Sequence, residues 1–319
     1  MFFVHLTASL RISLLILCAL VPPGPAGAGT TLRVGSIPIV GNVALYCAMD
    51  HGGLAAEGIE VQSTDFQSGT RIVEALAGGS LDIGFSATLS VLQAVQQGLD
   101  LVIVASGSFK AADNRASTSA LVARKDAGIT GAAQLRGKTV AVNSLRSLDY
   151  LIAAEYLSRG GLSPRDVTWQ ELSYSHMVPA LDNTRVDAAF VAEPFLSILR
   201  NEDRVTVLSA ALDIIPGTST ASYTALRSWT QSRPAVLEAF RRGLRRGIDA
   251  CARDSQKIRD AVAKHTGIKP ALAQEIGLPV LRPTLRAADL LPLVELARRH
   301  GLLVRDVDIE RLLSTGATR

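Results

Sequence analysis

The chain consists largely of short apolar segments that alternate with helical patterns, and this alternation limits the folds it can adopt. Predicted strands lie at residues 31–37, 59–66 and 99–105, and paired glycines such as Gly78-Gly79 end the helical patterns between them. Strands with continuous apolar runs, separated by helices, are typical of a parallel sheet that helices cover on both faces. The sequence therefore predicts an α/β protein.

The same pattern starts again about 105 residues later, which indicates an internal repeat. Asp82 and Asp187 each follow an Ala-Leu pair at the same separation and are expected to fix turns rather than to touch a ligand. Two similar βαβ units predict two lobes of one architecture. From residue 234 the chain is mainly helical, with helices expected at 234–253 and 290–300. Strands of the second unit are expected at residues 139–142, 167–172, 186–191 and 205–209.

The composition excludes several classes of protein. Of the 319 residues, 48% are hydrophobic and 19% charged, which excludes disorder, collagen and a coiled coil. The 33 Lys and Arg exceed the 29 Asp and Glu by only four, and they are too scattered for a nucleic-acid surface. The sequence has no CxxC or HExxH spacing, so we expect neither a metal nor a cofactor.

Residues 1–28 are predicted to be a secretory signal peptide that is cleaved after Ala28. Arg11 precedes an apolar run at 12–21, which prolines and then small residues follow. The run is shorter than the roughly 20 residues that span a bilayer. A buried N-terminal helix is one alternative. Lipidation at Cys18 is another, although Leu17 stands where that motif needs a small residue. No later stretch is long and apolar enough to span a membrane, so a soluble, exported chain is expected.

Three further features have a simple structural interpretation. Cys47 and Cys251 remain after cleavage, and export permits a disulfide between them. Both lie in helical patterns, and two buried free thiols are the preferred interpretation. Tyr46 is interpreted as a core residue. The four arginines between Arg241 and Arg246 recur at helical spacing and are interpreted as a solvated face, with contact to a membrane partner as the alternative.

Short motifs in both units match one known family. Those of the first unit are VG at 34–35, GIEV at 58–61, SG at 68–69, AL at 75–76 and DIG at 82–84. Those of the second are LRGKTVAV at 135–142, VDAA at 186–189 and EP at 193–194. Over roughly residues 31–250 the chain resembles the solute-binding proteins of ABC importers for nitrate, sulfonate, taurine and related ligands. The branch that binds thiamine-pyrimidine precursors has a similar pattern. One departure is Asn183-Thr184, where the family usually has a glycine.

The resemblance implies a periplasmic-binding-protein-like α/β fold, with two doubly wound lobes joined by a two-crossing hinge. Lobe 1 would comprise residues 29–117 and 219–319, and lobe 2 residues 118–218, with crossing strands at 118–124 and 219–226. It also implies a monomeric periplasmic protein whose lobes close on a small molecule by hinge motion. The closed form would dock on the permease subunits of an ABC transporter.

Ligand-binding residues are expected in the loops that follow the strands, because open α/β sheets bind ligands at the carboxyl ends of their strands. Helix N-termini in these loops expose unpaired N–H groups, which suit an anion. Under the repeat Ser68 corresponds to Ser173, so the two loops would face each other across the cleft. The candidates are Pro38, Asn42, Ser68, Gly69, Thr70, Ser86, Thr88, Asn143, Ser144, Arg146, Ser173, His176 and Glu193.

Several candidates also have a second interpretation. Ser68, Gly69 and Thr70 combine a close backbone approach with two hydroxyls, but such residues also cap helices. Arg146 would clamp a sulfonate or carboxylate with its planar guanidinium, or it lies on the solvated surface. His176 is likewise a polar cleft residue or a surface residue.

Glu193 corresponds to Thr88 in the repeat and is therefore expected at the cleft. There its carboxylate would pair with an amine on the ligand, which favours ligands that carry nitrogen. Two alternatives stay open: a role in hydrogen bonding between the lobes, and capping of the helix at Pro194.

An enzyme is the less favoured class, because the expected catalytic patterns are absent. The sequence has no GxSxG and no dinucleotide glycine pattern, and Cys47 and His51 lie within one predicted helix. The preferred function is therefore the substrate-binding component of an ABC importer, for a small anionic or zwitterionic solute such as a sulfonate, taurine or nitrate. The alternatives are a binding protein for a pyrimidine precursor or an aromatic carboxylate, and a ligand sensor of the same fold.

Overall fold

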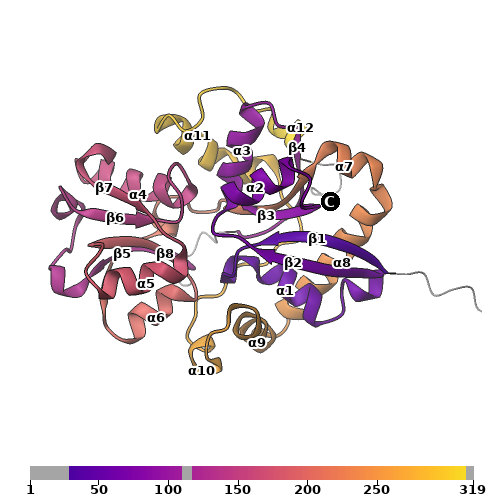
Figure 1. Ribbon diagram of the computed structural model, residues 1–319, viewed down its shortest axis with the longest axis horizontal. Coiled ribbons are helices and arrows are strands. Elements are labelled where there is room, and N and C mark those ends of the chain that lie inside the picture. Colours follow the sequence, from indigo (N-terminus) through magenta and orange to yellow (C-terminus); the bar gives the residue numbers. More distant parts are fainter. Residues whose placement is uncertain (1–28, 110–116, 314–319) are drawn as a thin grey trace, which may run out of the picture.

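The computed structural model describes residues 29–109 and 117–313, and its strands form two separate five-stranded sheets (Figure 1). The predicted signal peptide, residues 1–28, lies outside the described residues. The first sheet contains β1 (Thr30–Ser36), β2 (Ile59–Asp65), β3 (Ile83–Ala87), β4 (Leu101–Ser106) and β10 (Ala221–Leu226). The second contains β5 (Ser119–Arg124), β6 (Thr139–Val142), β7 (Thr168–Glu171), β8 (Ala188–Ala192) and β9 (Val205–Ala210).

The two sheets have the same construction. The first has the order β2-β1-β3-β10-β4 and the second β7-β6-β8-β5-β9. Four strands of each sheet run in the same direction, and the strand at the fourth position, β10 or β5, runs antiparallel to them. The chain crosses from the first sheet to the second after β4 and returns before β10. The predicted fold of two α/β lobes joined by two crossings is confirmed, whereas the exact lobe boundaries stay a prediction.

Helices cover both faces of each sheet, and we call each sheet with its helices a lobe (Figure 1). Lobe 2 carries α4 (Leu148–Arg159), α5 (Tyr174–Asp182) and α6 (Phe195–Asn201). Lobe 1 carries α1 (Val43–Asp50), α2 (Gly69–Ala77), α3 (Thr88–Gln96), α7 (Arg227–Ser232), α8 (Pro234–Ala252), α9 (Ser255–Thr266), α10 (Pro270–Ala273), α11 (Leu291–Arg299) and α12 (Ile309–Leu312). In the described residues no helix has both the length and the apolar character needed to cross a bilayer.

Burial of apolar side chains between the sheets and their helices explains why these elements pack in layers. One core cluster of lobe 1 joins the sheet to α1 and α8 through residues such as Val34 and Phe240. A second cluster runs without a break from Leu92 on α3 to Val140 in the sheet of lobe 2. Buried apolar area of this kind is the main stabilising contribution to the fold. The continuous second cluster also means that the two lobes are packed against each other.

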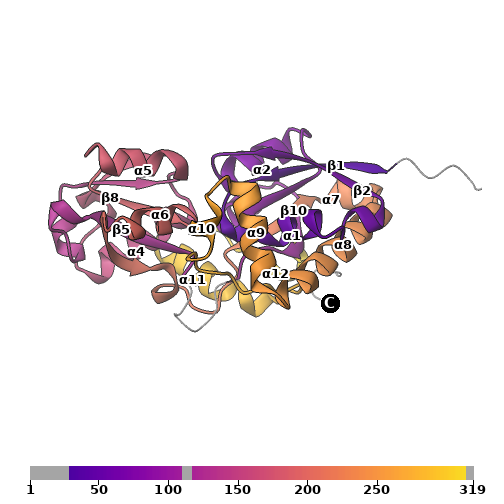
Figure 2. The same ribbon diagram turned by 90° about the horizontal axis from the view of Figure 1, so that it is seen from below.

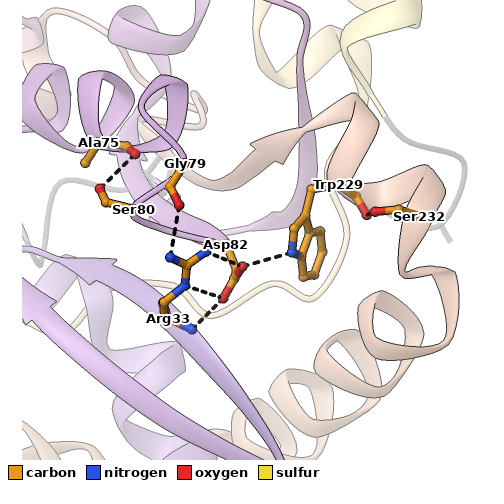
Figure 3. Close-up of polar contacts among 7 residues, drawn as sticks. All are labelled: Arg33, Ala75, Gly79, Ser80, Asp82, Trp229 and Ser232. Atoms are coloured by element: carbon orange, nitrogen blue, oxygen red, sulfur yellow. Dashed lines mark hydrogen bonds and ion pairs between the residues drawn. The ribbon is translucent and has the colours of Figure 1, made fainter.

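Asp82 lies before β3, at the end of the lobe 1 sheet opposite the crossings. Figure 3 shows its carboxylate between Arg33 and Trp229. Its Oδ2 accepts the backbone N–H of Arg33 at 2.9 Å, and its Oδ1 accepts Arg33 Nη2 at 2.9 Å and Trp229 Nε1 at 3.0 Å. Burial opposes ionisation, but the hydrogen bonds and charge of Arg33 hold the pKa of Asp82 below its ordinary value. In lobe 2 Asp187 accepts the backbone N–H of Thr139 at 2.9 Å, so the repeat predicted from sequence is also a repeat of this contact.

The structure corrects two predictions. Cys47 and Cys251 form a disulfide between α1 and α8, so the interpretation as two free thiols was wrong. Their helices pack directly on each other, which the sequence could not show across a separation of 204 residues. Arg241 is buried rather than solvated, because its face of α8 packs on the sheet and its Nε donates to the carbonyl of Val104 at 2.8 Å. By contrast Tyr46 is a core residue as predicted, stacked on His265.

The turn before β8 explains how the chain can have Asn183-Thr184 where the family usually has a glycine. Thr184 has φ 55°, the left-handed conformation that a glycine adopts at no steric cost. The backbone N–H of Thr184 bonds to the carbonyl of Leu181 at 3.1 Å. The turn therefore keeps a left-handed residue although the glycine is absent.

Candidate functional site

A cavity of about 70 Å³ lies between the lobes, at the carboxyl ends of the parallel strands. Lobe 1 contributes residues such as Ser68 and Phe85, and lobe 2 residues such as Asn143 and Tyr174. Both crossings also reach the wall, through Ser119 and its neighbours and through Ala221. A ligand in this cavity would therefore contact both lobes and both crossings.

The wall combines apolar and polar side chains. Ile37, Phe85, Ile152 and Phe190 supply apolar surface. The polar groups are hydroxyls, one amide and one carboxylate, contributed by Ser68, Thr70, Ser90, Ser108, Thr118, Ser119, Asn143, Ser147, Asp149, Tyr174 and Thr220. Such a wall suits a small organic solute that is held by apolar contact and oriented by hydrogen bonds.

Three helices begin at the cavity, one from lobe 1 and two from lobe 2. Gly69 and Thr70 are the first residues of α2, Leu148 and Asp149 are the first residues of α4, and Tyr174 is the first residue of α5. The first N–H groups of a helix have no partner within it and carry partial positive charge. These helix starts therefore present donors to an acceptor group on a ligand.

A chain of hydrogen bonds connects three wall residues of lobe 2. The Tyr174 hydroxyl donates to Asp149 Oδ2 at 2.8 Å, and Asn143 Nδ2 donates to the Tyr174 oxygen at 3.2 Å. Burial and the neighbouring carboxylate of Asp149 raise the pKa of Tyr174 well above its ordinary value. Tyr174 therefore stays protonated and keeps its donor.

The structure brings four of the predicted site residues together on the wall: Ser68, Gly69, Thr70 and Asn143. Asn42 instead lies in the core of lobe 1, where it donates to Ser36 at 2.7 Å and accepts from Tyr223 at 2.8 Å. Ser86 and Thr88 are fully buried behind the wall.

The remaining loop candidates lie near the cavity but do not line it. Pro38 is half-buried between two wall residues. Ser144 donates to Glu171 at 3.3 Å, and Ser173 bonds to Nδ1 of the exposed His176 at 2.8 Å. Arg146 is exposed with φ 61°, and its carbonyl, rather than its guanidinium, makes a contact between the lobes.

Glu193 is buried next to the crossings and holds three parts of the molecule together. Its carboxylate accepts the backbone N–H and the hydroxyl of Ser197 at 3.0 and 2.9 Å. Its Oε1 also accepts the N–H of Gly277 at 3.4 Å, and its carbonyl accepts the N–H of Val40 at 3.0 Å. Burial raises the pKa of Glu193 above its ordinary value, although the bonds from Ser197 oppose the rise. Both structural alternatives are therefore observed, capping of α6 and bonding between the lobes.

Further hydrogen bonds join the lobes around the cavity. Gln67 of lobe 1 donates to the carbonyl of Asn143 at 3.3 Å, and Gln93 donates to that of Arg146 at 3.0 Å. His300, after α11, contacts Glu155 on α4 at 2.8 Å. Figure 2 shows α10 and α11 beside the junction of the two lobes; His300 follows α11, and Gly277, which donates to Glu193, follows α10. The structure is thus a closed arrangement of the lobes.

Sequence reasoning missed wall residues that lie one or two positions from its candidates. Tyr174 follows Ser173 directly, and Phe85 precedes Ser86. Asp149 lies in the first turn of α4, a position that acidic residues often take for helix stability alone. The described residues contain no group of three or more His, Cys, Asp or Glu placed to bind a metal ion.

Comparisons with known proteins agree with this geometry. A family model described as NMT1/THI5 like matches residues 41–258. The taurine-binding periplasmic protein of Escherichia coli K12 is 26% identical over 185 residues, which are 57% of this chain and 55% of that protein. The chain thus matches about half the length of this curated relative.

Solved structures share the fold over most of the chain. The alkanesulfonate-binding protein SsuA from Xanthomonas axonopodis pv. citri, bound to MOPS, has a TM-score of 0.75 at 20% identity, covering 89% of this chain and 98% of its own. The desulfurization enzyme DSZB has a TM-score of 0.65 at 15% identity, covering 89% and 96%. At these identities the likeness concerns the fold, which binding proteins and an enzyme share.

Proposed function

The chain belongs to the NMT1/THI5-like family, and we propose that it is the substrate-binding component of an ABC importer for a small sulfonate or taurine-like solute. The observation that carries this proposal is the interlobe cavity, whose wall comes from both lobes and both crossings. A ligand that bonds to both walls favours the closed arrangement, because it loses half of its contacts when the lobes open. The N-termini of α2 and α4 would meet the sulfonate oxygens.

The mechanism uses binding energy alone. The solute enters the open cleft, bonds to both lobes and is enclosed, and the closed form then docks on the permease and releases its cargo unchanged. We further propose that residues 1–28 direct export to the periplasm and are removed, in line with the naming of the E. coli relative as a periplasmic protein.

A thermal-shift screen of the exported protein tests this proposal. The panel would contain taurine, alkanesulfonates, nitrate, aromatic carboxylates and aminopyrimidines. A ligand at 100 times its Kd adds roughly 2.7 kcal/mol to the free energy of unfolding, which is a shift of several degrees. Recovery of the unchanged ligand by mass spectrometry would support transport over catalysis. Stabilisation by a pyrimidine alone would replace the sulfonate class, and turnover of the bound compound would overturn the binding function.

A further inference from the structure

One wall residue has a polar atom that the protein itself does not satisfy. Asn143 is 7% exposed, and its Oδ1 is buried without a hydrogen-bond partner among the described residues. Buried amide oxygens are nearly always paired, because leaving one unpaired costs much of the hydration that it had in water. The group therefore needs a donor from outside the protein chain.

The orientation of this amide is fixed by its neighbours. Tyr174 uses its single hydroxyl proton toward Asp149 at 2.8 Å, so it can only accept from the Asn143 side chain. The Asn143 group that faces Tyr174 at 3.2 Å is therefore the NH₂. The opposite side of the amide, Oδ1, is thereby set as a hydrogen-bond acceptor.

Asn143 also lies where the two lobes meet. Its backbone carbonyl accepts Gln67 Nε2 of lobe 1 at 3.3 Å, and its side chain belongs to the cavity wall. A partner for Oδ1 that arrives with the ligand would thus be enclosed when the lobes close. Across the cavity, Gly69 and Thr70 at the start of α2 offer donors, so the cavity contains donors for an acceptor group of the ligand in addition to this acceptor.

We propose that Asn143 Oδ1 accepts a hydrogen bond from a donor on the ligand. The solute then carries an N–H or O–H group in addition to its acceptor group. Asn143 is then a specificity-determining residue, and Tyr174 and Asp149 are positioning residues that hold its amide. Solutes that have only acceptors, such as nitrate or an unsubstituted alkanesulfonate, bind more weakly. This inference rests on the proposed function and adds the chemical class of its ligand.

A matched series of three sulfonates tests the inference by calorimetry on the exported protein. Taurine, isethionate and 1-propanesulfonate have the same chain length and end in an ammonium, a hydroxyl and a methyl group. We expect taurine or isethionate to bind at least tenfold more tightly than 1-propanesulfonate, because only they pair with Oδ1. Equal affinities would overturn the inference and leave the proposed function intact. Absence of binding by all three would overturn the sulfonate function and the inference with it.

Two variants test whether the selectivity among these ligands depends on the Asn143 amide. Asn143→Leu removes the acceptor and should reduce the preference to less than threefold, whereas Asn183→Leu, the same change at an exposed position, should keep it. Tyr174→Phe keeps the ring but frees the amide to rotate, and should lower the selectivity while 1-propanesulfonate binds as before. A merely structural role would weaken all three ligands equally. Full selectivity in both site variants would overturn the assignment.

Discussion

The backbone N–H of Val40 donates to the carbonyl oxygen of Glu193 at 3.0 Å, which joins the loop after β1 directly to the end of β8. Because β1 and β8 belong to different lobes, the bond joins the two lobes directly. The carboxylate of the same glutamate accepts hydrogen bonds from Ser197 and Gly277. Glu193 thus links the lobes beside the cavity without being part of its wall.

Replacement of this glutamate tests its role in linking the lobes. Glu193→Ala should lower the free energy of unfolding by about 1–3 kcal/mol, because buried donors of Ser197 lose their acceptor. The folded pKa of Glu193 is raised, so its contribution is fully present below about pH 4.5 and declines as pH rises through the folded value. Denaturant unfolding should therefore show a larger loss at pH 4 than at pH 8. Glu74→Ala, in an exposed ion pair, is the control, and an equal loss at both pH values would contradict the assignment.

The carboxylate of Asp82 should show the opposite pH dependence. Its folded pKa is lowered, so its contribution is present above about pH 3.8 and is lost as pH falls through the folded value. Asp82→Asn should cost about 1–3 kcal/mol at pH 7, and the difference from the parent protein should shrink below pH 3. Urea titrations at both pH values measure this. Asp306→Asn, whose residue is 94% exposed in its ion pair, should have almost no effect, and a cost for Asp82→Asn that is independent of pH would argue against the charge as its cause.

Gly69 allows the start of α2 to approach the end of β3. A Cβ at this position would lie 2.7 Å from the backbone nitrogen of Ala87, so Gly69→Ala must displace the helix. We expect a loss of about 1–3 kcal/mol and weaker ligand binding, because both residues line the cavity. A Cβ at Gly131 would meet nothing within 4 Å, and Gly131→Ala should change stability by less than about 0.5 kcal/mol. Unchanged affinity in Gly69→Ala would exclude the helix start from the binding site.

The disulfide between Cys47 and Cys251 should respond to reductant. Without this bond the unfolded chain has more conformational entropy. We therefore expect the free energy of unfolding to fall by about 2–5 kcal/mol. Thermal unfolding with and without dithiothreitol measures this loss. The double variant Cys47→Ala/Cys251→Ala should resemble the reduced protein and be insensitive to reductant. Two titratable thiols in the untreated exported protein would contradict the bond.

The strands, the repeat and several of the loops that line the cavity could be predicted from the sequence, because they depend on local apolar patterns and on glycine turns. The wall residues could not all be predicted, because they depend on which way each side chain points. Phe85 and Ala87 line the cavity, whereas Ser86 between them points to the opposite face of β3. Arg146 does not line the cavity. Its backbone is left-handed, a conformation that an arginine in the sequence does not indicate.

The position of β10 between β3 and β4 also makes the two lobes unequal in chain connectivity. All strands of the lobe 2 sheet lie in one continuous segment, residues 119–210, and can pair without any other part of the chain. The lobe 1 sheet needs β10, so β4 pairs with a strand from which the whole of lobe 2 separates it in sequence. Completion of lobe 1 therefore depends on contacts across the full length of lobe 2, whereas lobe 2 depends on none in lobe 1.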